Sequence, residues 1–331
     1  MMIVNDSVYG ENKISDKLIL ELIKTKAMQR LKGINQYGTW HFFNPEMLTT
    51  RFDHSLGVYF LLRRFNAPKE EQVAGLIHDV NHGVFSHVID YVHGQPERQE
   101  HHDEVKESMI MKTEIPEVLG RHDMDVEKVM DEKRFPLLER PLPDLCADRL
   151  DYFLRDSLLL NICSQEDIDF FLKHIVVYNN EFVMNSFEAA SKIALAFLEC
   201  SRIFYSPPVQ ALSYQILADA IKKGLDAGIL KESDLWTEDE LVMEKLRESN
   251  NNDILRNLNL LNPSLKIEED EQNYDYLVQS KVRYIDPNVL TDGRLKRVSE
   301  KDKNLKQNLE DYKKRLEKGY HVRLCKEMPQ M

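Results

Sequence analysis

The sequence is poor in cysteine, and its few cysteines are widely separated. The four residues, Cys146, Cys163, Cys200 and Cys325, form no Cys-x-x-Cys pair. This spacing argues against a disulfide framework and against a cysteine-based zinc site. It is typical of a protein whose thiols stay reduced, as they do in the cytoplasm.

Long apolar runs and an excess of positive charge are also missing. No stretch approaches the roughly 20 consecutive apolar residues that span a bilayer, and residues 1–10 lack the basic and apolar regions of a secretory signal. The 44 Lys and Arg residues are outnumbered by 56 Asp and Glu residues, which gives a net charge of −12. We therefore expect a cytoplasmic protein that enters no membrane and is a poor candidate for binding nucleic acid.

Histidine, by contrast, is concentrated in one part of the chain. Seven of the eleven histidines fall within the 49 residues from His54 to His102. They are His54, His78, His82, His87, His93, His101 and His102. Because imidazole can bind metals and transfer protons near neutral pH, this segment is the first candidate for a functional site.

The spacing of apolar residues predicts an all-α fold over most of the chain. Capping residues, prolines and glycines predict helices over 15–33, 55–65, 68–78, 143–160, 186–204 and 209–227. Two β-forming runs around Asn179-Asn180 predict a small β-hairpin over 175–184. The chain length suits one helical domain over residues 1–260 and a minor C-terminal appendage over 261–331, part of it a charged helix over 296–319.

Four candidate metal ligands occur in three separate segments: His54, the adjacent His78 and Asp79, and Asp148. Imidazole nitrogens and carboxylate oxygens together suit Fe, Mn, Zn, Co or Ni better than Mg or Ca. Neighbouring residues of a helix diverge by about 100°, so His78 and Asp79 reach one metal most easily at a helix end.

Three blocks around these residues resemble the HD-domain phosphohydrolases, and most closely their deoxynucleoside triphosphate triphosphohydrolase branch. The blocks read RFDHSLGV from Arg51, LIHDVNHGVFSH from Leu76 and DRLDYFLRD from Asp148. The resemblance is specific because three blocks, each several residues long, occur in the same order as in the family. The motif core covers about residues 29–156. The second block departs from the family at Asn81, where glycine is usual, and at Val84, where proline is usual. The resemblance implies the helical HD fold.

The resemblance also implies a role for each matching residue around one metal. The metal ligands would be His54, His78, Asp79 and Asp148. The substrate-binding residues would be Gln36 against the sugar, Arg51 and Arg149 on phosphate, Tyr152 on the ribose and Asp156 on its 3′-hydroxyl. Guanidinium groups suit phosphate oxygens, and a carboxylate can accept a hydrogen bond from a hydroxyl.

Catalytic residues are implied in the histidine-rich segment by the same resemblance. They would be His82, His87, Asp90 and His102, with His101 as the alternative to His102. We predict that His102 and Asp90 form a proton-handling pair and that His87 lies beside the leaving group. Asp151 and Arg155, at i,i+4 spacing, are expected to form a structural ion pair.

These features predict a metal-dependent phosphohydrolase of nucleotides. The resemblance implies attack on the α-phosphorus of a deoxynucleoside triphosphate, which leaves deoxynucleoside and triphosphate, with Mg²⁺ carried by the substrate. It also implies a homo-oligomer. Three alternatives remain open: an HD-fold phosphatase of nucleoside monophosphates or another phosphoester, a dimetal oxygenase, and a non-catalytic nucleotide-binding regulator. Gln36 and Tyr152 are the positions that best separate the two hydrolases.

Overall fold

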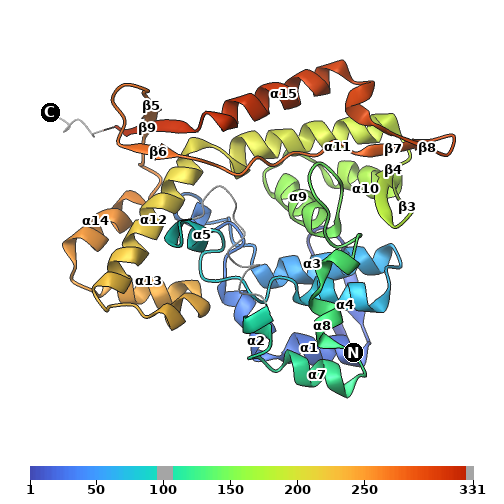
Figure 1. The fold of residues 1–331 in the computed structure, drawn as a ribbon, viewed down its shortest axis with the longest axis horizontal. Helices are drawn as coiled ribbons and strands as arrows, with labels where there is room; N and C mark the ends of the chain where they lie inside the picture. The colour runs from blue at the N-terminus through green and yellow to red at the C-terminus, as the bar shows by residue number, and fades with distance from the viewer. Residues whose placement is uncertain (95–106, 326–331) are drawn as a thin grey trace.

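The computed structural model describes residues 1–94 and 107–325, which form a body of packed helices edged by short strands (Figure 1). The helices are α1 (Lys17–Lys24), α2 (Lys26–Arg30), α3 (Arg51–Arg64), α4 (Lys69–Ile77), α5 (Val88–Val92), α7 (Ile115–Arg121), α8 (Val126–Met130), α9 (Ala147–Leu159), α10 (Gln165–His174), α11 (Phe187–Cys200), α12 (Pro208–Asp226), α13 (Asp239–Arg247), α14 (Asn252–Leu260) and α15 (Lys303–Glu317). The strands are β1 (Met2–Asp6), β2 (Gly10–Ile14), β3 (Ile175–Tyr178), β4 (Glu181–Met184), β5 (Ile267–Glu269), β6 (Tyr276–Val278), β7 (Asn288–Thr291), β8 (Arg294–Arg297) and β9 (Tyr320–Leu324).

Helix α3 is the element on which the motif blocks assemble. Thr50 and Asp53 form a reciprocal capping box that fixes where the helix begins. Nearly every side chain of its first three turns is buried, and the helix packs against both α4 and α9. Gly57 permits the close approach of α9, because a Cβ there would lie 2.0 Å from Asp151 Oδ1. The packing of α4 and α9 on α3 thus brings the three motif blocks together, since α3 carries the first block, the end of α4 begins the second and α9 carries the third.

Helix α4 ends at the His78-Asp79 pair, as the sequence predicted. His78 is the C-cap residue. The backbone then turns tightly, because Val80 N donates to Ile77 O and His82 N donates to Asp79 O. The side chains of His78 and Asp79 can therefore point toward one common site, although adjacent side chains within a straight helix diverge.

The other expected helices are present with shifted ends. The expected helix over 15–33 is interrupted at Thr25, whose side chain caps α2, and α1 begins after its N-cap residue Asp16. The helix expected to begin at Pro143 begins at Ala147. The predicted hairpin over 175–184 is confirmed as the antiparallel pair β3 and β4.

Strand content in the described residues is greater than the sequence suggested. The helix-rich class and the small hairpin are both confirmed, but the described residues form three small sheets in all. Strands β1 and β2 form a hairpin before α1. Strands β7 and β8 extend the predicted hairpin to a sheet of order β3-β4-β7-β8, and a further sheet has the order β5-β9-β6. Each of the described strands is only three to five residues long, too short for a clear alternating pattern.

The C-terminal segment packs against the rest of the molecule. Helix α15 lies along α11 (Figure 1) and buries Leu305, Leu309, Tyr312 and Leu316. Strand β7 pairs in parallel with β4. Between β6 and β7, the carbonyl of Gln279 accepts a hydrogen bond from Tyr91 of α5. Among the described residues, no helix is long and apolar enough to cross a lipid bilayer.

Candidate functional site

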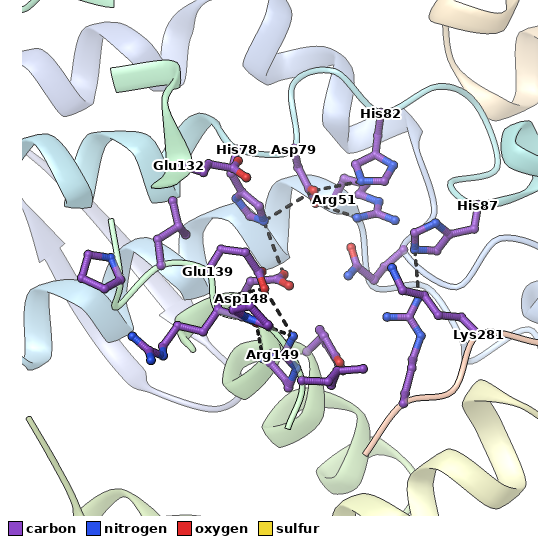
Figure 2. A pocket seen from close by; sticks show the side chains of 18 of the residues that line it. Arg51, His78, Asp79, His82, His87, Glu132, Glu139, Asp148, Arg149 and Lys281 are labelled. Carbon is purple, nitrogen blue, oxygen red and sulfur yellow. Dashed lines mark hydrogen bonds and ion pairs between the residues drawn. The ribbon is translucent and has the colours of Figure 1, made fainter. Parts of the chain in front are cut away.

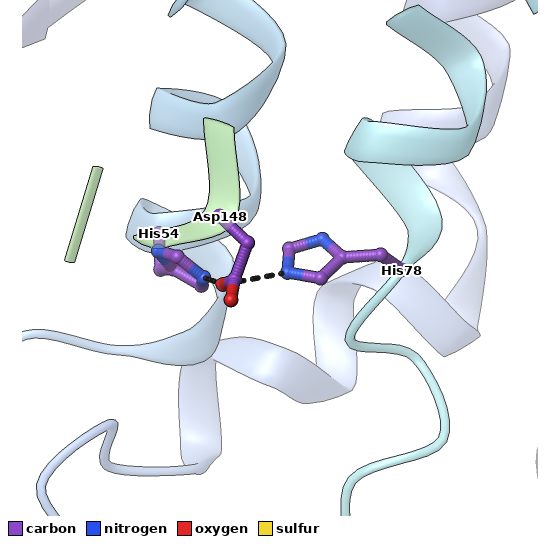
Figure 3. Close-up of side chains that lie close together, drawn as sticks. All are labelled: His54, His78 and Asp148. Carbon is purple, nitrogen blue, oxygen red and sulfur yellow. Dashed lines mark hydrogen bonds and ion pairs between the residues drawn. The ribbon is translucent and has the colours of Figure 1, made fainter. Parts of the chain in front are cut away.

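Three of the four predicted metal ligands converge from three elements. His54 lies in the first turn of α3, His78 at the end of α4, and Asp148 in the first turn of α9. One ligand atom of each lies within 4.8 Å of the other two. Figure 3 shows the two imidazole rings on either side of the Asp148 carboxylate.

The hydrogen bonds of His78 prepare one ring nitrogen for a metal. Its Nδ1 lies 2.8 Å from the carbonyl oxygen of Gly75, so Nδ1 carries the proton and donates it. Its Nε2 is buried and has no hydrogen-bond partner in the described part of the chain. A lone pair left unpaired in a buried site, beside the carboxylates of Asp79 and Asp148 at 3.4 and 3.5 Å, fits a divalent cation.

His54 lies between two carboxylates. Its Nδ1 is 2.8 Å from Asp151 Oδ2, and its Nε2 is 2.9 Å from Asp148 Oδ1. Although burial alone would lower it, these carboxylates raise the pKa of His54 to about 10. The site therefore attracts positive charge at Nε2, whether a proton or a metal ion.

Asp151 is a functional candidate that the sequence reasoning missed. The predicted ion pair with Arg155 is present, with Nη2 3.0 Å from Asp151 Oδ1. The other oxygen of Asp151 holds His54, and Arg155 also pairs with Asp6 of β1. A carboxylate that orients a ligating histidine is a common feature of metal sites. The i,i+3 spacing from Asp148 was the available signal.

Asp79 joins the candidate ligands to Arg51 and His82. Its Oδ2 accepts a hydrogen bond from Arg51 Nη1 at 2.9 Å and lies 3.9 Å from His54 Nε2. Its Oδ1 lies 3.2 Å from His82 Nε2. The Nε of Arg51 donates to Ser86 Oγ at 2.9 Å. The structure thus places all four predicted ligands together, with Asp79 on the side that Arg51 occupies.

A cavity of about 760 Å³ opens beside the ligands (Figure 2). Six cationic side chains line it, against four carboxylates, although the whole chain is acidic. The cations are Arg51, Lys133, Arg140, Arg149, Lys281 and Arg283. Arg149 donates to the carbonyl oxygens of Arg140 and Asp144 and pairs with Glu139, so it also holds the loop before α9. A polyanion could bind in this cavity next to the metal ligands.

A smaller cavity of about 60 Å³ adjoins the first and shares Gln36, Arg51, His87, Tyr152 and Arg283 with it. Aromatic rings and one carboxylate complete its wall. Asp156 Oδ2 accepts a hydrogen bond from Tyr205 at 2.8 Å, and burial raises the pKa of Asp156 to about 7. Asp156 Oδ1 and Gln36 Oε1 are buried without a hydrogen-bond partner among the described residues. Both are acceptors suited to a ligand hydroxyl or N–H group.

The predicted catalytic histidines lie between these features. His87 Nδ1 is 3.0 Å from Asp90 Oδ2, and His87 Nε2 is 3.3 Å from Arg283 Nη2. Burial and the nearby arginines hold the pKa of His87 well below its usual range. Burial and Arg51 likewise lower the pKa of His82 to about 3. His102 and its alternative, His101, lie outside the described residues, so the predicted pair of His102 with Asp90 stays a prediction.

Other residues reach the site from segments that the motif blocks do not contain. They include Tyr205, Lys281 and Arg283. Nothing in their local sequence marks them, because each joins the site through packing between distant segments.

Comparison with known proteins identifies the family. The HD domain model matches residues 51–156. The chain is 34% identical to the uncharacterized protein YdhJ of Bacillus subtilis, over 98% of this chain and 100% of that protein. It is 30% identical to the metal-dependent phosphohydrolase cns2 of Cordyceps militaris, over 88% of this chain and 86% of that protein. The chain belongs to the HD-domain metal-dependent phosphohydrolases.

Two further matches bear on the fold and on the branch of this family. A crystal structure of a hypothetical protein from Aquifex aeolicus has the same fold, with a TM-score of 0.70 and 20% identity over 95% of this chain and 99% of that one. The deoxynucleoside triphosphate triphosphohydrolase SAMHD1 homolog of Dictyostelium discoideum is 29% identical over 48% of this chain and 36% of its own length. The resemblance inferred from the three motif blocks is confirmed at the level of the superfamily.

Proposed function

We propose that this HD phosphohydrolase converts deoxynucleoside triphosphates to deoxynucleosides and triphosphate. The observation that carries the proposal is the joining of two cavities beside the ligand cluster, one large and basic, the other small and aromatic. A triphosphate chain matches the first in charge, and a sugar matches the second in its acceptors and ring faces. The partial similarity to a deoxynucleoside triphosphate triphosphohydrolase supports the same reading.

His54, His78, Asp79 and Asp148 would hold the metal, and their nitrogen and oxygen donors suit Fe, Mn, Zn, Co or Ni. Such a metal supplies a Lewis acid for the phosphoryl group and an activated water. Asp151 would fix the ring of His54, and the carbonyl of Gly75 would fix that of His78. The protein thereby sets the direction of both imidazole lone pairs before substrate arrives.

The remaining site residues would bind and orient the nucleotide. Arg51 and Arg149 would offset the charge of the phosphates, together with Mg²⁺ brought by the substrate. Tyr152 would pack on the ribose, where its ring leaves little room for a 2′ substituent. Gln36 and Asp156 present unpaired acceptor oxygens to the same place.

His87 would act beside the leaving oxygen. Its Nδ1–H points to Asp90, which leaves Nε2 directed toward the cavity and Arg283. An incoming phosphate would counter the arginine charges that disfavour protonation of His87, so that Nε2 could deliver a proton to the departing oxygen. His82, held neutral against Asp79, would support the metal-binding carboxylate, and His102 stays a candidate partner of Asp90.

A product-resolved assay tests this proposal. Elemental analysis of the purified chain identifies the metal, and each dNTP, the matching ribonucleotides and the dNMPs are then incubated with the metal-loaded protein. We expect triphosphate from at least one dNTP. Release of orthophosphate from monophosphates alone would favour the phosphatase alternative, and tight nucleotide binding without turnover would favour the regulator. Light scattering during gel filtration tests the predicted homo-oligomer.

The assignment of the ligands has its own test. Replacing Asp79 with Ala should lower kcat/KM by more than about 100-fold, since even residues that only orient metal ligands cost 10- to 100-fold. Asp226→Asn, at an exposed position at the end of α12, is the matched control and should keep full activity. Full turnover by the Asp79 variant would refute the site.

A further inference from the structure

A segment of the C-terminal region lines the larger cavity beside the candidate metal ligands. Residues 279–287, here termed the crossing segment, are attached at both ends and in the middle. The carbonyl of Gln279 accepts a hydrogen bond from Tyr91 at 2.9 Å, and that of Lys281 accepts one from Ser206 at 3.3 Å. Asp286 N donates to Pro143 O at 3.1 Å. These attachments give the crossing segment a defined place against the motif helices.

The crossing segment brings two cationic side chains to the cavity. Lys281 lines the larger cavity, and Figure 2 shows it beside His87, across the cavity from Glu139. Arg283 lines both cavities, and its guanidinium contacts His87, which also lines both. Its carbon Cζ lies 5.9 Å from the centre of the Tyr152 ring, close enough for a cation–π contact.

The contact between Arg283 and His87 is weaker than the one a phosphate would offer. Because His87 donates through Nδ1 to Asp90, its Nε2 is an uncharged acceptor for Arg283 Nη2 at 3.3 Å. Phosphate oxygens carry charge and match the planar fork of a guanidinium, so they form shorter and stronger hydrogen bonds with it. A phosphate entering between the two cavities would therefore compete with His87 Nε2 for Arg283.

We propose that Arg283, assisted by Lys281, binds the phosphate chain of the substrate and releases His87 when that chain enters. This inference rests on the proposed function for the identity of the nucleotide. It does not need that function for the binding of phosphate itself. Arg283 is thus a substrate-binding residue supplied from outside the HD domain match, which ends at residue 156.

Inorganic triphosphate is the probe that tests the binding step directly. Its affinity for the full, metal-loaded chain is measured by calorimetry for wild type and for Arg283→Gln, Arg283→Lys and Lys281→Gln. We expect a loss of about tenfold or more for Arg283→Gln, consistent with the removal of one charged hydrogen bond, and smaller losses for the other two. Arg294→Gln removes a cation from the exposed strand β8 and should bind like wild type.

Turnover distinguishes this inference from the proposed function. If wild type hydrolyses dNTPs, Arg283→Gln should raise KM and lower kcat, because it removes both phosphate binding and the release of His87. Wild-type triphosphate affinity in Arg283→Gln, with wild-type metal content and thermal unfolding, would overturn the inference and leave the proposed function standing. If Arg283→Gln weakens triphosphate binding but wild type hydrolyses no dNTP, the inference stands and the proposed function is overturned. If Arg283→Gln fails to fold, the Arg283→Lys and Lys281→Gln variants decide, and wild-type affinity in both overturns the inference.

Discussion

The two ring nitrogens of His54 illustrate how single residues set the chemistry of this site. One nitrogen is fixed by Asp151, and the other faces Asp148. Its combination with His78, Asp79 and Asp148 in the motif blocks made His54 a candidate ligand, but a histidine can ligate only when the correct nitrogen is free of its proton. The carboxylate of Asp151 decides this, since it holds the proton on Nδ1.

A variant of Asp151 tests this role. Asp151→Asn keeps the size of the side chain but removes its charge, so it should hold the His54 proton less firmly. We expect the apparent metal affinity to fall by about 10- to 100-fold, measured by competition with a chelator of known affinity. Asp226→Asn should leave that affinity unchanged. An unaltered affinity in Asp151→Asn would show that the contact with His54 is only structural.

At the scale of elements, the site depends on the close packing of α3 against α9. Gly57 makes this approach possible, since a Cβ at that position would lie 2.0 Å from Asp151 Oδ1 and 2.3 Å from Arg155 Nη2. Those atoms belong to a buried ion pair that also includes Asp6, so they cannot move aside easily. The spacing of the two helices and the orientation of His54 are therefore linked.

Two glycine variants separate this packing from helix propensity. Gly57→Ala should lower the free energy of unfolding by about 1–3 kcal/mol through overpacking and should weaken metal binding as well. Gly120→Ala in α7 has open space around the new methyl group and should be neutral or stabilising by up to about 1 kcal/mol. Chemical denaturation measures the free energy of unfolding of both variants. Equal changes in the two would show that close packing of α9 at Gly57 does not contribute to stability.

At the scale of the whole molecule, distant segments hold the loops that carry the site. Asp239, the first residue of α13, accepts hydrogen bonds from the backbone N–H groups of Asn35 and Phe85 at 2.8 and 2.6 Å. Phe85 and Ser86 both have positive φ angles, of 54° and 53°, which non-glycine residues seldom adopt without support. Val84 N also donates to Leu235 O, a bond that the usual proline of the family could not make.

Burial of Asp239 predicts a pH dependence of stability. Burial raises the pKa of Asp239 from 3.8 to about 7. The folded state therefore keeps a proton that the unfolded state has lost, so this group destabilises the fold as pH rises between about 4 and 7. The expected slope is about 1.4 kcal/mol per pH unit, and Asp239→Asn should lack it.

Urea unfolding of wild type and Asp239→Asn at several pH values within that window measures this difference. Below the window wild type should be the more stable, because Asn offers one carbonyl oxygen to two backbone donors. The stability of wild type relative to Asp239→Asn should then decrease as pH rises. A difference in unfolding free energy between the two proteins that stays constant with pH would contradict the raised pKa of Asp239. The free energy of unfolding of Asp226→Asn should change with pH as that of wild type does.

Much of the fold and part of the site could be predicted because their signals are local. Capping residues and apolar spacing predicted α4, α12 and the β3–β4 hairpin, since these depend on neighbouring residues. The strands β5 and β9 were not predicted, because each is short and is stabilised only by pairing with segments far along the chain. The pairing of β7 with β4 was missed for the same reason.

The sequence by itself predicted the chemical character of the protein: His54, His78, Asp79 and Asp148 as the proposed donor set, the arginines beside them, and the superfamily. These predictions follow from residue types within three short motif blocks, which folding does not change. Only the tertiary structure decided which His54 nitrogen faces the metal site, where Asp239 acts, and that Lys281 and Arg283 line the cavity. Those facts are contacts between distant segments, and they arise from packing and burial that no local pattern encodes.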